Sequence, residues 1–333
     1  VVIPVYNAHD AVKDCLDSLV RTLPSHVNVL MIDDCSPDKR INLLLNKYHH
    51  KNGFGHVKNN VNLGYTKTVN KAISLFPEHD IVLLNSDTVT TSGWINSMRY
   101  IAYSKDRVAT VTALSDNSGA FSVPEIGEFN EIKAGLSHEQ HARLITQNTP
   151  GEYMAVPTGN GFCFYIRRDF LNQFGLFDED KYPIGYGEEN DLCMRAFRGG
   201  WKNLICDKAF VYHKRSQSFK DDKTKLMQDG ANQLRADYPE YKKLITRFHD
   251  VEFNLMRSTV RSALSSNESV LPRALFVIST TTGGTPQTNL DLMRAVSDKY
   301  SCYLLRCDRL SIYLSVLING ELETLKEVQL KEQ

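Results

Sequence analysis

Residues 83–94 read "LLNSDTVTTSGW", an apolar run that ends in a short polar cluster. At the end of an extended strand, the side chains of Asn85 and Asp87 point the same way because they are two residues apart. Side-chain oxygens placed like this can bind a divalent cation whose remaining ligands are phosphate oxygens and water. On its own, the stretch fits equally well an Asx turn that starts a helix near residue 93. The surrounding sequence has to distinguish the two.

Around this stretch, the first 115 residues alternate between strand and helix patterns. Strands are predicted where apolar and β-branched residues cluster, and helices where apolar residues recur at helical spacing, as Val12, Leu16 and Leu19 do. The alternation predicts right-handed βαβ units and a mostly parallel sheet. Such sheets bind ligands at the carboxyl ends of their strands. The polar residues that follow the predicted strands are Tyr6-Asn7, Asp33-Asp34, Asn59-Asn60 and Asn85–Thr88.

Composition restricts the class of protein. The chain has 333 residues, 42% of them hydrophobic, so it can bury a full core and is not expected to be disordered. Its 39 basic residues balance its 39 acidic residues, which argues against general nucleic-acid binding. The seven cysteines show no CxxC spacing and predict reduced thiols of a cytoplasmic protein. No apolar run approaches the roughly 18 residues that span a bilayer.

Pattern changes along the chain predict three parts. We expect a catalytic-type α/β domain over 1–215, in which the looser segment 116–155 shapes a pocket. Residues 216–268 are charged and helical in pattern, without motifs, and predict a helical linker or extension. From 269 the pattern becomes strand, glycine-rich turn, helix and strand, which predicts a truncated Rossmann-like segment over 269–333. Because the chain begins inside an apolar strand without Met, we interpret it as part of a longer sequence.

The first two strands limit the nucleotide chemistry. A dinucleotide-binding domain needs GxGxxG after its first strand, whereas the turn here reads "PVYNAHD" without glycine. The second strand ends in Asp33 and Asp34. The Asp34 carboxylate can accept hydrogen bonds from a nucleobase N–H or a ribose hydroxyl, or it can cap the helix near Pro37. The residues alone leave both roles open.

An acidic cluster opens the helix predicted in "GYGEENDLCMRAFRGGW" (185–201). Glu188, Glu189 and Asp191 could simply complement the helix dipole. Carboxyl groups that crowd together in a pocket have raised pKa values, however, which suits a general base. Glu189 and Asp191 point about 200° apart on a helix, and Asp191 can pair with Arg195 four residues later. We therefore predict Glu189 as the base, beside Glu188, and Asp191 as an orienting or acceptor-binding residue.

His213 ends the strand predicted in "NLICDKAFVYH" (203–213). A lone histidine is more often structural than metal-ligating. A carboxylate metal site at the end of another strand of the same sheet would favour a ligand role for its neutral imidazole.

Taken in order, seven motifs resemble the inverting family-2 glycosyltransferases, and among these the bacterial rhamnosyltransferase-like members. They are "VVIPVYN", "MIDDCSPD", "NLGYTKTVNKA", "LLNSDT", "GNGFCFYIRRDFLNQFGLFDE", "GYGEENDLCMRAFRGG" and "VYHKRSQSF". The resemblance covers about residues 1–219. It implies an α/β fold of the GT-A nucleotide-diphospho-sugar transferase type, with a nucleotide-sugar half followed by an acceptor half.

The resemblance also implies a role for the motif residues. Asp34 contacts the nucleotide base, Asp87 closes the family's metal-binding DxD motif, and His213 matches a further metal ligand. Asn85 stands where the first Asp of that motif is usual, so we expect weaker metal affinity or a single carboxylate ligand. The family's acidic pair falls on Glu188-Glu189, with Glu189 where Asp is common. The implied nucleotide- and donor-binding residues are Pro4, Tyr6, Asn7, Asp33, Asp34, Asn62, Gly64, Lys67, Asn85 and Ser86.

The C-terminal segment resembles a second class. "GGTPQTNLDLM" (283–293) is similar to the glycine-rich loop that opens GT-B glycosyltransferases of family 4. A GT-B enzyme needs two complete Rossmann-like halves, so the segment would not be catalytic by itself. We expect the natural chain to continue into a second transferase domain.

These inferences predict an inverting, metal-dependent glycosyltransferase that moves a sugar from a nucleotide-diphosphate sugar to a hydroxyl of an oligosaccharide or lipid-linked glycan. The expected cofactor is Mn²⁺ or Mg²⁺, and the expected process is bacterial cell-surface polysaccharide synthesis, in the cytoplasm at the inner face of the membrane. The alternative is a non-catalytic carbohydrate-binding or scaffolding module that retained the fold. Asn85 favours this alternative, whereas the joint presence of Asp87, Glu189 and His213 argues against it.

Overall fold

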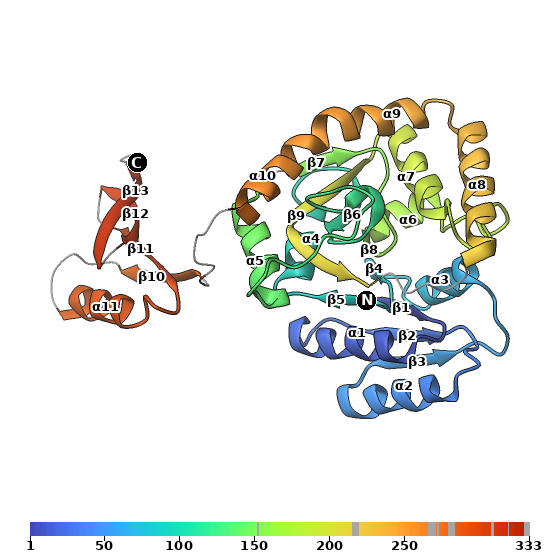
Figure 1. Ribbon diagram of the computed structural model, residues 1–333, viewed down its shortest axis with the longest axis horizontal. Helices are drawn as coiled ribbons and strands as arrows, with labels where there is room; N and C mark the ends of the chain where they lie inside the picture. The colour runs from blue at the N-terminus through green and yellow to red at the C-terminus, as the bar shows by residue number, and fades with distance from the viewer. Residues whose placement is uncertain are drawn as a thin grey trace. The chain divides into compact units, whose positions relative to one another are not determined.

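The structure is a computed structural model that describes residues 1–151, 153–214, 220–265, 271, 273–278, 284–307, 310–318 and 320–329. The chain divides into two compact units, Val1–Ser266 and Asn267–Gln333. Figure 1 shows the elements of each unit. None of the helices in the described ranges is long and apolar enough to cross a membrane.

The described part of the first unit contains one nine-stranded sheet. Its order is β3-β2-β1-β4-β8-β6-β9-β5, and β7 pairs with β9. The four strands at one side are parallel to one another, as the βαβ pattern predicts: β1 (Val2–Val5), β2 (Leu30–Asp33), β3 (Gly55–Lys58) and β4 (Ile81–Leu84).

The other side of this sheet mixes strand directions. The central strand β8 (Cys163–Ile166) is antiparallel to both of its neighbours, β4 and β6 (Val108–Leu114), whereas β9 (Lys202–His213) is parallel to β6. Two short strands, β5 (Thr88–Thr90) and β7 (Tyr153–Val156), pair antiparallel with β9. Because β8 is reversed, the residues that precede it lie at the carboxyl ends of the parallel strands.

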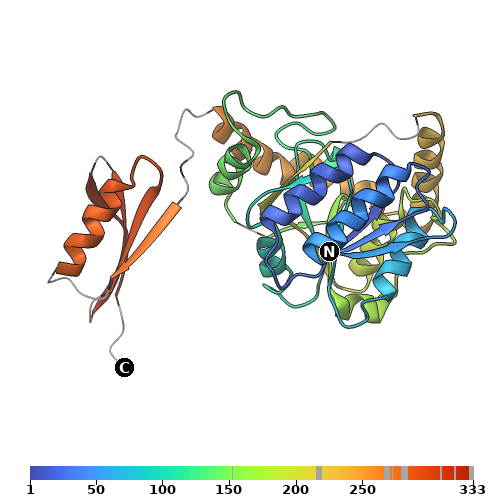
Figure 2. The ribbon, with the colours of Figure 1, turned by 90° about the horizontal axis from the view of Figure 1, so that it is seen from below.

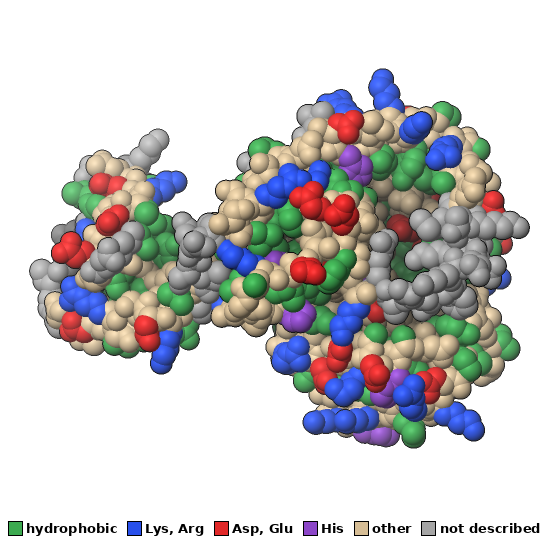
Figure 3. Space-filling view, in the orientation of Figure 1, with side chains coloured by type: hydrophobic (Ala, Val, Ile, Leu, Met, Phe, Trp, Pro, Cys, Tyr) green, Lys and Arg blue, Asp and Glu red, His purple; other side chains and the backbone are tan. Residues whose placement is uncertain are grey.

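Helices cover both faces of the sheet. Alternate residues of one strand point to opposite faces, so Ile3 packs into one core cluster and Val2 into the other. The first cluster includes α1 (His9–Thr22), α2 (Lys39–Asn52) and α4 (Trp94–Ala102), and Figure 2 shows α1 and α2 side by side. The second includes α3 (Tyr65–Ser74), α6 (Arg168–Phe174) and α7 (Glu188–Arg198). Figure 3 shows basic and acidic side chains interspersed over α1 and α2, in keeping with the balanced charge.

The segment 116–155, predicted to be loose, contains more regular structure than expected. It holds a short 3₁₀ turn (Gly119–Phe121), the helix α5 (His138–Asn148) and part of β7. Ser137 and Gln140 form a capping box at the start of α5, which is a sequence signal for a helix N-terminus. Apolar residues at helical spacing follow it, among them Ala142 and Ile145, and both are buried against the third core cluster.

Three helices that follow the sheet belong to the first unit. They are α8 (Lys220–Asp237), α9 (Tyr241–Arg247) and α10 (Phe253–Ser265), with a π-helical turn (Phe248–Glu252) before α10. Phe253, Met256 and Val260 of α10 are buried in the cluster that contains α5 and β9. Leu234 of α8 and Tyr238, which directly follows α8, pack on Met194 of α7. Residues 220–265 are thus packed onto the α/β core.

The second unit consists of one helix and a four-stranded sheet in its described residues. β10 (Arg273–Ile278), α11 (Gly284–Ala295) and β11 (Ser301–Cys307) form the parallel strand–helix–strand unit that the sequence predicts. β12 (Ser311–Ile318) and β13 (Glu321–Gln329) then add an antiparallel hairpin, so the sheet is mixed. The start of the glycine-rich turn, residues 279–283, lies outside the described residues.

Candidate active site

The polar residues that follow the predicted strands lie at one edge of the first sheet. β1, β2 and β4 are parallel, so their carboxyl ends face the same way. The register pairs Leu84, the last residue of β4, with Cys163, the first of β8. This pairing brings the turn Gly159–Phe162 to the same edge. The register of β5 on β9 likewise pairs Thr88 with His213, so both predicted metal ligands meet there.

At the end of β2, two carboxylates hold neighbouring loops in place. Asp34 is buried and accepts hydrogen bonds from the Asn59 side chain (2.9 Å) and from the backbone N–H groups of Leu63 (2.8 Å) and Gly64 (3.0 Å). Asp33 is fully buried and accepts from Ser36 N at 2.8 Å. Asp34 therefore shapes the loop that precedes α3, and its predicted contact with a nucleobase stays a prediction.

The other predicted donor-binding residues surround these two carboxylates or follow β4. Asn7 has a left-handed backbone (φ 57°), and its N–H donates to Ser36 Oγ at 2.9 Å. The Asn62 side chain accepts from Gly64 N at 3.0 Å, at the start of α3. The remaining positions have these placements: Pro4 within β1 opposite Ile32, Tyr6 half-buried after β1, Lys67 exposed on α3, and Ser86 half-buried after β4.

Asp87 and His213 form a close pair. Asp87 Oδ1 lies 3.1 Å from His213 Nε2, and Asn85 Nδ2 lies 3.4 Å from the same ring nitrogen. The opposite ring nitrogen, Nδ1, lies 3.1 Å from the carbonyl oxygen of Asn117 and donates its hydrogen to it. With Nδ1 bonded in this way, the second ring nitrogen, Nε2, is the one that faces Asn85 and Asp87.

The residues that hold the His213 side chain in position are not among those predicted from the sequence. Asp116 Oδ1 accepts from the backbone N–H of His213 at 2.9 Å, and the ring of Phe162 stacks on the imidazole with centroids 5.4 Å apart. Asp116 and Asn117 follow β6 and continue the same pattern of polar residues after a strand. That pattern was the signal available in the sequence.

The pair fits a divalent cation as two adjacent ligands. A histidine whose second nitrogen bonds a carbonyl is the usual arrangement of a metal-ligating imidazole. Two ligand atoms at about 2.1 Å from a metal and at a right angle lie about 3.0 Å apart, close to the 3.1 Å between Asp87 Oδ1 and His213 Nε2. In the part of the chain that the structure describes, no cluster of three or more His, Cys, Asp and Glu side chains is suited to hold a metal. Other ligands would have to come from the substrate and water.

The acidic pair at the start of α7 is buried. Burial raises the pKa of Glu188 well above its ordinary 4.5, and the adjacent Glu189 carboxylate raises it further. Burial also raises the pKa of Glu189, but hydrogen bonds from backbone N–H groups and from Glu188 oppose this effect. Glu188 is thus the member that retains its proton to higher pH and donates it to its neighbour. Glu189 is the member left to act as a proton acceptor, and its Oε2 is buried without a partner among the described residues.

The turn Gly159–Phe162 contacts both the acidic pair and the Asp87–His213 pair. The N–H of Gly161 donates to the Glu189 carboxylate, while the next residue, Phe162, accepts from Asn85 N at 2.9 Å and stacks on His213. A Cβ at Gly161 would lie 3.5 Å from the Tyr65 hydroxyl, an ordinary van der Waals distance. Glu189 and the Asp87–His213 pair therefore flank the same turn.

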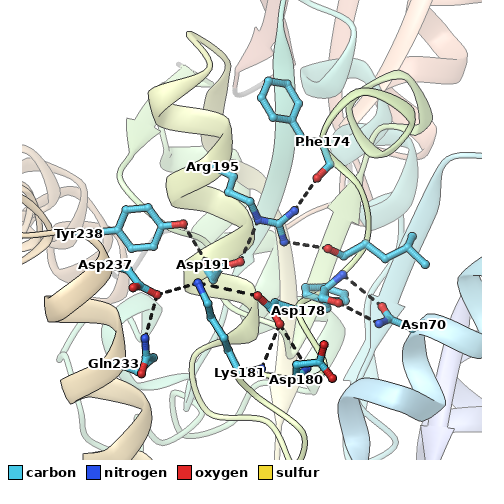
Figure 4. A network of polar contacts seen from close by, with 12 residues as sticks. Asn70, Phe174, Asp178, Asp180, Lys181, Asp191, Arg195, Gln233, Asp237 and Tyr238 are labelled. Atoms are coloured by element: carbon cyan, nitrogen blue, oxygen red, sulfur yellow. Dashed lines mark hydrogen bonds and ion pairs between the residues drawn. The ribbon is translucent and has the colours of Figure 1, made fainter.

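Asp191 lies apart from this arrangement. Its Oδ2 accepts from Arg195 Nε at 2.8 Å, and its Oδ1 accepts from the Tyr238 hydroxyl at 2.8 Å. Arg195 also donates to the carbonyl oxygens of Phe174 and Leu176, and Figure 4 shows this network between α7 and α8. The predicted pairing of Asp191 with Arg195 is confirmed. Both carboxylate oxygens are engaged within the fold, and the predicted orienting or acceptor-binding role of Asp191 stays a prediction.

Comparison with known proteins identifies the family of the chain. The sequence model of glycosyl transferase family 2 matches residues 1–175, more than half of the chain. The poly(ribitol-phosphate) β-glucosyltransferase of Bacillus spizizenii is 32% identical over 116 residues, which cover 34% of this chain and 18% of that protein. The uncharacterized glycosyltransferase EpsJ of Bacillus subtilis is 21% identical over 234 residues, which cover 66% and 61%. The chain thus spans less than two thirds of either relative.

Two solved structures share the fold. A mannosyltransferase from Pyrobaculum calidifontis, in complex with GDP-Man and Mn²⁺, superposes with a TM-score of 0.53 at 13% identity, over 90% of this chain and 79% of its own. GalNAc-T7 with UDP, GalNAc and Mn²⁺ superposes with a TM-score of 0.51 at 19% identity, over 78% and 53%. The predicted α/β fold of the GT-A type is confirmed. With the family match over its first 175 residues, the chain belongs to glycosyl transferase family 2.

Proposed function

We propose that the first unit is an inverting glycosyltransferase that binds a nucleotide-diphosphate sugar at the carboxyl edge of its sheet and uses Glu189 as the general base. One observation carries the proposal. A buried carboxylate with a raised pKa and an unpartnered oxygen lies at the same turn as the Asp87–His213 pair. This arrangement offers a proton acceptor beside a place for a diphosphate.

The donor end of the site would be organised by charge and by backbone. Asp87 and His213 are the residues that would hold a divalent cation, and the complexes of two proteins of this fold with Mn²⁺ and a nucleotide support this assignment. A cation bound there would supply positive charge to the leaving diphosphate. Asn85 brings no charge to this site, so the ligand set is less anionic than a pair of carboxylates.

The transfer step needs one base. The acceptor hydroxyl loses its proton to Glu189, its oxygen forms a bond to the anomeric carbon, and the bond from that carbon to the diphosphate oxygen breaks. Attack from the face opposite the leaving group inverts the configuration. Glu188, which keeps its own proton, hydrogen-bonds the Glu189 carboxylate and orients it. A base with a pKa above that of an ordinary carboxylate is better matched to a reaction near neutral pH.

The acceptor that we propose is a hydroxyl of a bacterial cell-surface polysaccharide or its lipid-linked precursor. The 32% identity to a poly(ribitol-phosphate) β-glucosyltransferase supports this class of acceptor. All seven cysteines are free, in keeping with the predicted reduced thiols. We propose a cytoplasmic reaction, with peripheral association at the inner face of the membrane.

A donor screen tests the proposal. The chain is incubated with UDP-, GDP- and dTDP-sugars in Mn²⁺, Mg²⁺ or EDTA, and nucleotide release is measured without an acceptor. We expect slow hydrolysis of one donor class in Mn²⁺ or Mg²⁺ and none in EDTA. A Glu189→Gln variant should bind that donor without hydrolysing it. Donor binding without turnover in the unsubstituted chain, with every acceptor tried, would favour the non-catalytic alternative.

A further inference from the structure

Helix α8 contains a glycine in its interior, where glycine lowers the stability of a helix. Gly230 lies inside Lys220–Asp237, within the sequence "QDGANQ". Glycine is among the least favourable residues in a helix interior because its backbone loses the most freedom on folding. Close approach of another segment to the helix backbone is one physical reason for a glycine at such a position.

The segment that approaches Gly230 is the turn before the acidic pair. A Cβ at residue 230 would lie 1.8 Å from the carbonyl oxygen of Tyr186 and 3.0 Å from its carbonyl carbon. Both are backbone atoms, so a larger residue could not be accommodated by rotation of a neighbouring side chain. The backbones of α8 and of the turn 185–187 therefore touch directly.

This turn has an unusual backbone over three consecutive residues. Gly185, Tyr186 and Gly187 have φ values of 104°, 68° and 144°. Tyr186 has a Cβ and still adopts the left-handed region, which persists only where the surroundings enforce it. A Cβ at Gly187 would lie 2.5 Å from the ring of Tyr182. The next residue is Glu188, so the conformation of the turn determines where the acidic pair points.

The end of α8 and Tyr238, the residue that directly follows it, hold the start of α7 and the segment before it at a second point. The Tyr238 hydroxyl donates to Asp191 at 2.8 Å, and Lys181 contacts Asp237 at 3.0 Å. Figure 4 shows these contacts reaching from α8 to α7 and to the segment before it. Tyr238 also packs on Met194 with Leu234. The acidic pair thus lies between the contact at Tyr186 and the contact at Asp191.

We propose that Gly230 is a positioning residue for the Glu188–Glu189 pair, and that α8 holds the base in place through the turn 185–187. This inference rests on the proposed role of Glu189. In the chain, α8 follows β9, the strand that ends at His213. Residue 230 touches neither substrate nor reacting atoms in this assignment and acts only through the turn.

Gly230→Ala tests the proposal, with Asp229→Ala as the matched control. Asp229 is exposed beside Gly230 on the same helix, so its substitution changes the helix without touching the turn. For Gly230→Ala we expect kcat to fall by roughly 10- to 100-fold, the effect of a base displaced by about 1 Å. The KM for the donor should stay within about twofold, since the donor end of the site is on other strands. Asp229→Ala should change neither parameter.

Two further readouts separate positioning from a general loss of folded protein. The titratable groups that face Glu189 are Glu188 beside it, Tyr65 of α3, Cys193 of α7 and Tyr241 of α9. A displaced pair is less buried, so the acid limb of the kcat profile should move to lower pH in Gly230→Ala. Amide hydrogen exchange in the first turn of α7 should rise on the order of tenfold. A smaller folded fraction alone would leave unchanged both the pH of the acid limb of the kcat profile and the KM for the donor.

The outcomes distinguish this inference from the proposed function. If Glu189→Gln abolishes turnover but Gly230→Ala retains the wild-type kcat, pH limb and exchange rates, the positioning role is wrong and the function stands. If Glu189→Gln retains turnover, both fail. If Gly230→Ala does not fold, Tyr238→Phe decides, because it removes only the hydroxyl at the second contact. An unchanged kcat and pH limb in Tyr238→Phe would then overturn the proposal.

Discussion

The substitution Asp191→Asn tests whether the Asp191 carboxylate has a structural role or a catalytic one. Asp191 is 2% exposed and binds the partly exposed Arg195 and the buried Tyr238 hydroxyl. Asn keeps one oxygen, so one of the two bonds is lost while the other can remain. A hydrogen bond to a charged group contributes about 1.5–3 kcal/mol. We therefore expect the free energy of unfolding of Asp191→Asn to fall by about 2 kcal/mol.

Asp191→Ala should cost more. It removes both acceptors and leaves Arg195 without its carboxylate, although the guanidinium keeps the Phe174 and Leu176 carbonyl oxygens and part of its contact with water. Breaking a buried ion pair costs about 3–5 kcal/mol, so we expect a loss near the lower end of that range. Tyr238→Phe, which leaves the ion pair intact, should cost only about 1–2 kcal/mol.

Urea denaturation followed by tryptophan fluorescence measures these losses, and a donor-turnover assay on the same samples measures activity. We expect Asp191→Asn to keep at least about a tenth of the wild-type turnover, because its effect on catalysis is indirect. An Asp191→Asn protein that is as stable as the unsubstituted chain and yet inactive would refute this assignment. The base would then be Asp191.

Three further predictions follow from the same contacts. Asp87→Ala should remove the Mn²⁺ dependence of nucleotide-diphosphate binding while the protein stays folded; equal affinities by calorimetry with and without Mn²⁺ in both proteins would contradict it. The raised pKa values of Glu188 and Glu189 mean that the base is protonated at low pH, so kcat should rise with pH through a value above 4.5; a profile that is flat down to pH 4.5 would exclude the pair. A chain of residues 1–266 should fold and bind nucleotide. A chain of residues 1–215 should be unstable, because it lacks the helices that complete the core. Thermal melts of the two chains compare their stabilities, and equal melting temperatures would contradict this prediction.

Much of the fold could be predicted from hydrophobic period alone. The alternation of strands and helices in the first 115 residues predicts the parallel part of the sheet, in which β1, β2 and β4 are buried on both faces. The reversed strand β8 carries no such signal, since an apolar run of four residues looks the same in either direction. The hairpin of β12 and β13 is not among the predicted elements, although Asn319-Gly320 follows the apolar run 312–318 and is a strong turn signal.

The residues of the candidate site could be predicted from the sequence, but the groups that hold them in position could not. Asp87 follows β4 and His213 ends β9, and the structure brings the two side chains within 3.1 Å. The Asn117 carbonyl accepts from His213, and the Gly161 N–H donates to Glu189. Both are backbone groups, which every residue type carries, so the sequence does not reveal them. The boundary predicted at 215 also depends on long-range packing. Helices without motifs resemble a linker until their partners on the core, such as Asp191 for Tyr238, are known.

The central claim is that Glu189 accepts the proton of the attacking hydroxyl. Glu189→Gln keeps the size of the side chain and removes the basic oxygen, so it tests the claim most directly. Once a donor is identified, turnover and donor affinity are measured for the variant and the unsubstituted chain side by side. We predict that turnover falls by about 10²- to 10⁴-fold, the usual contribution of a general base, while donor affinity is unchanged. A Glu189→Gln protein with near wild-type turnover would contradict the assignment.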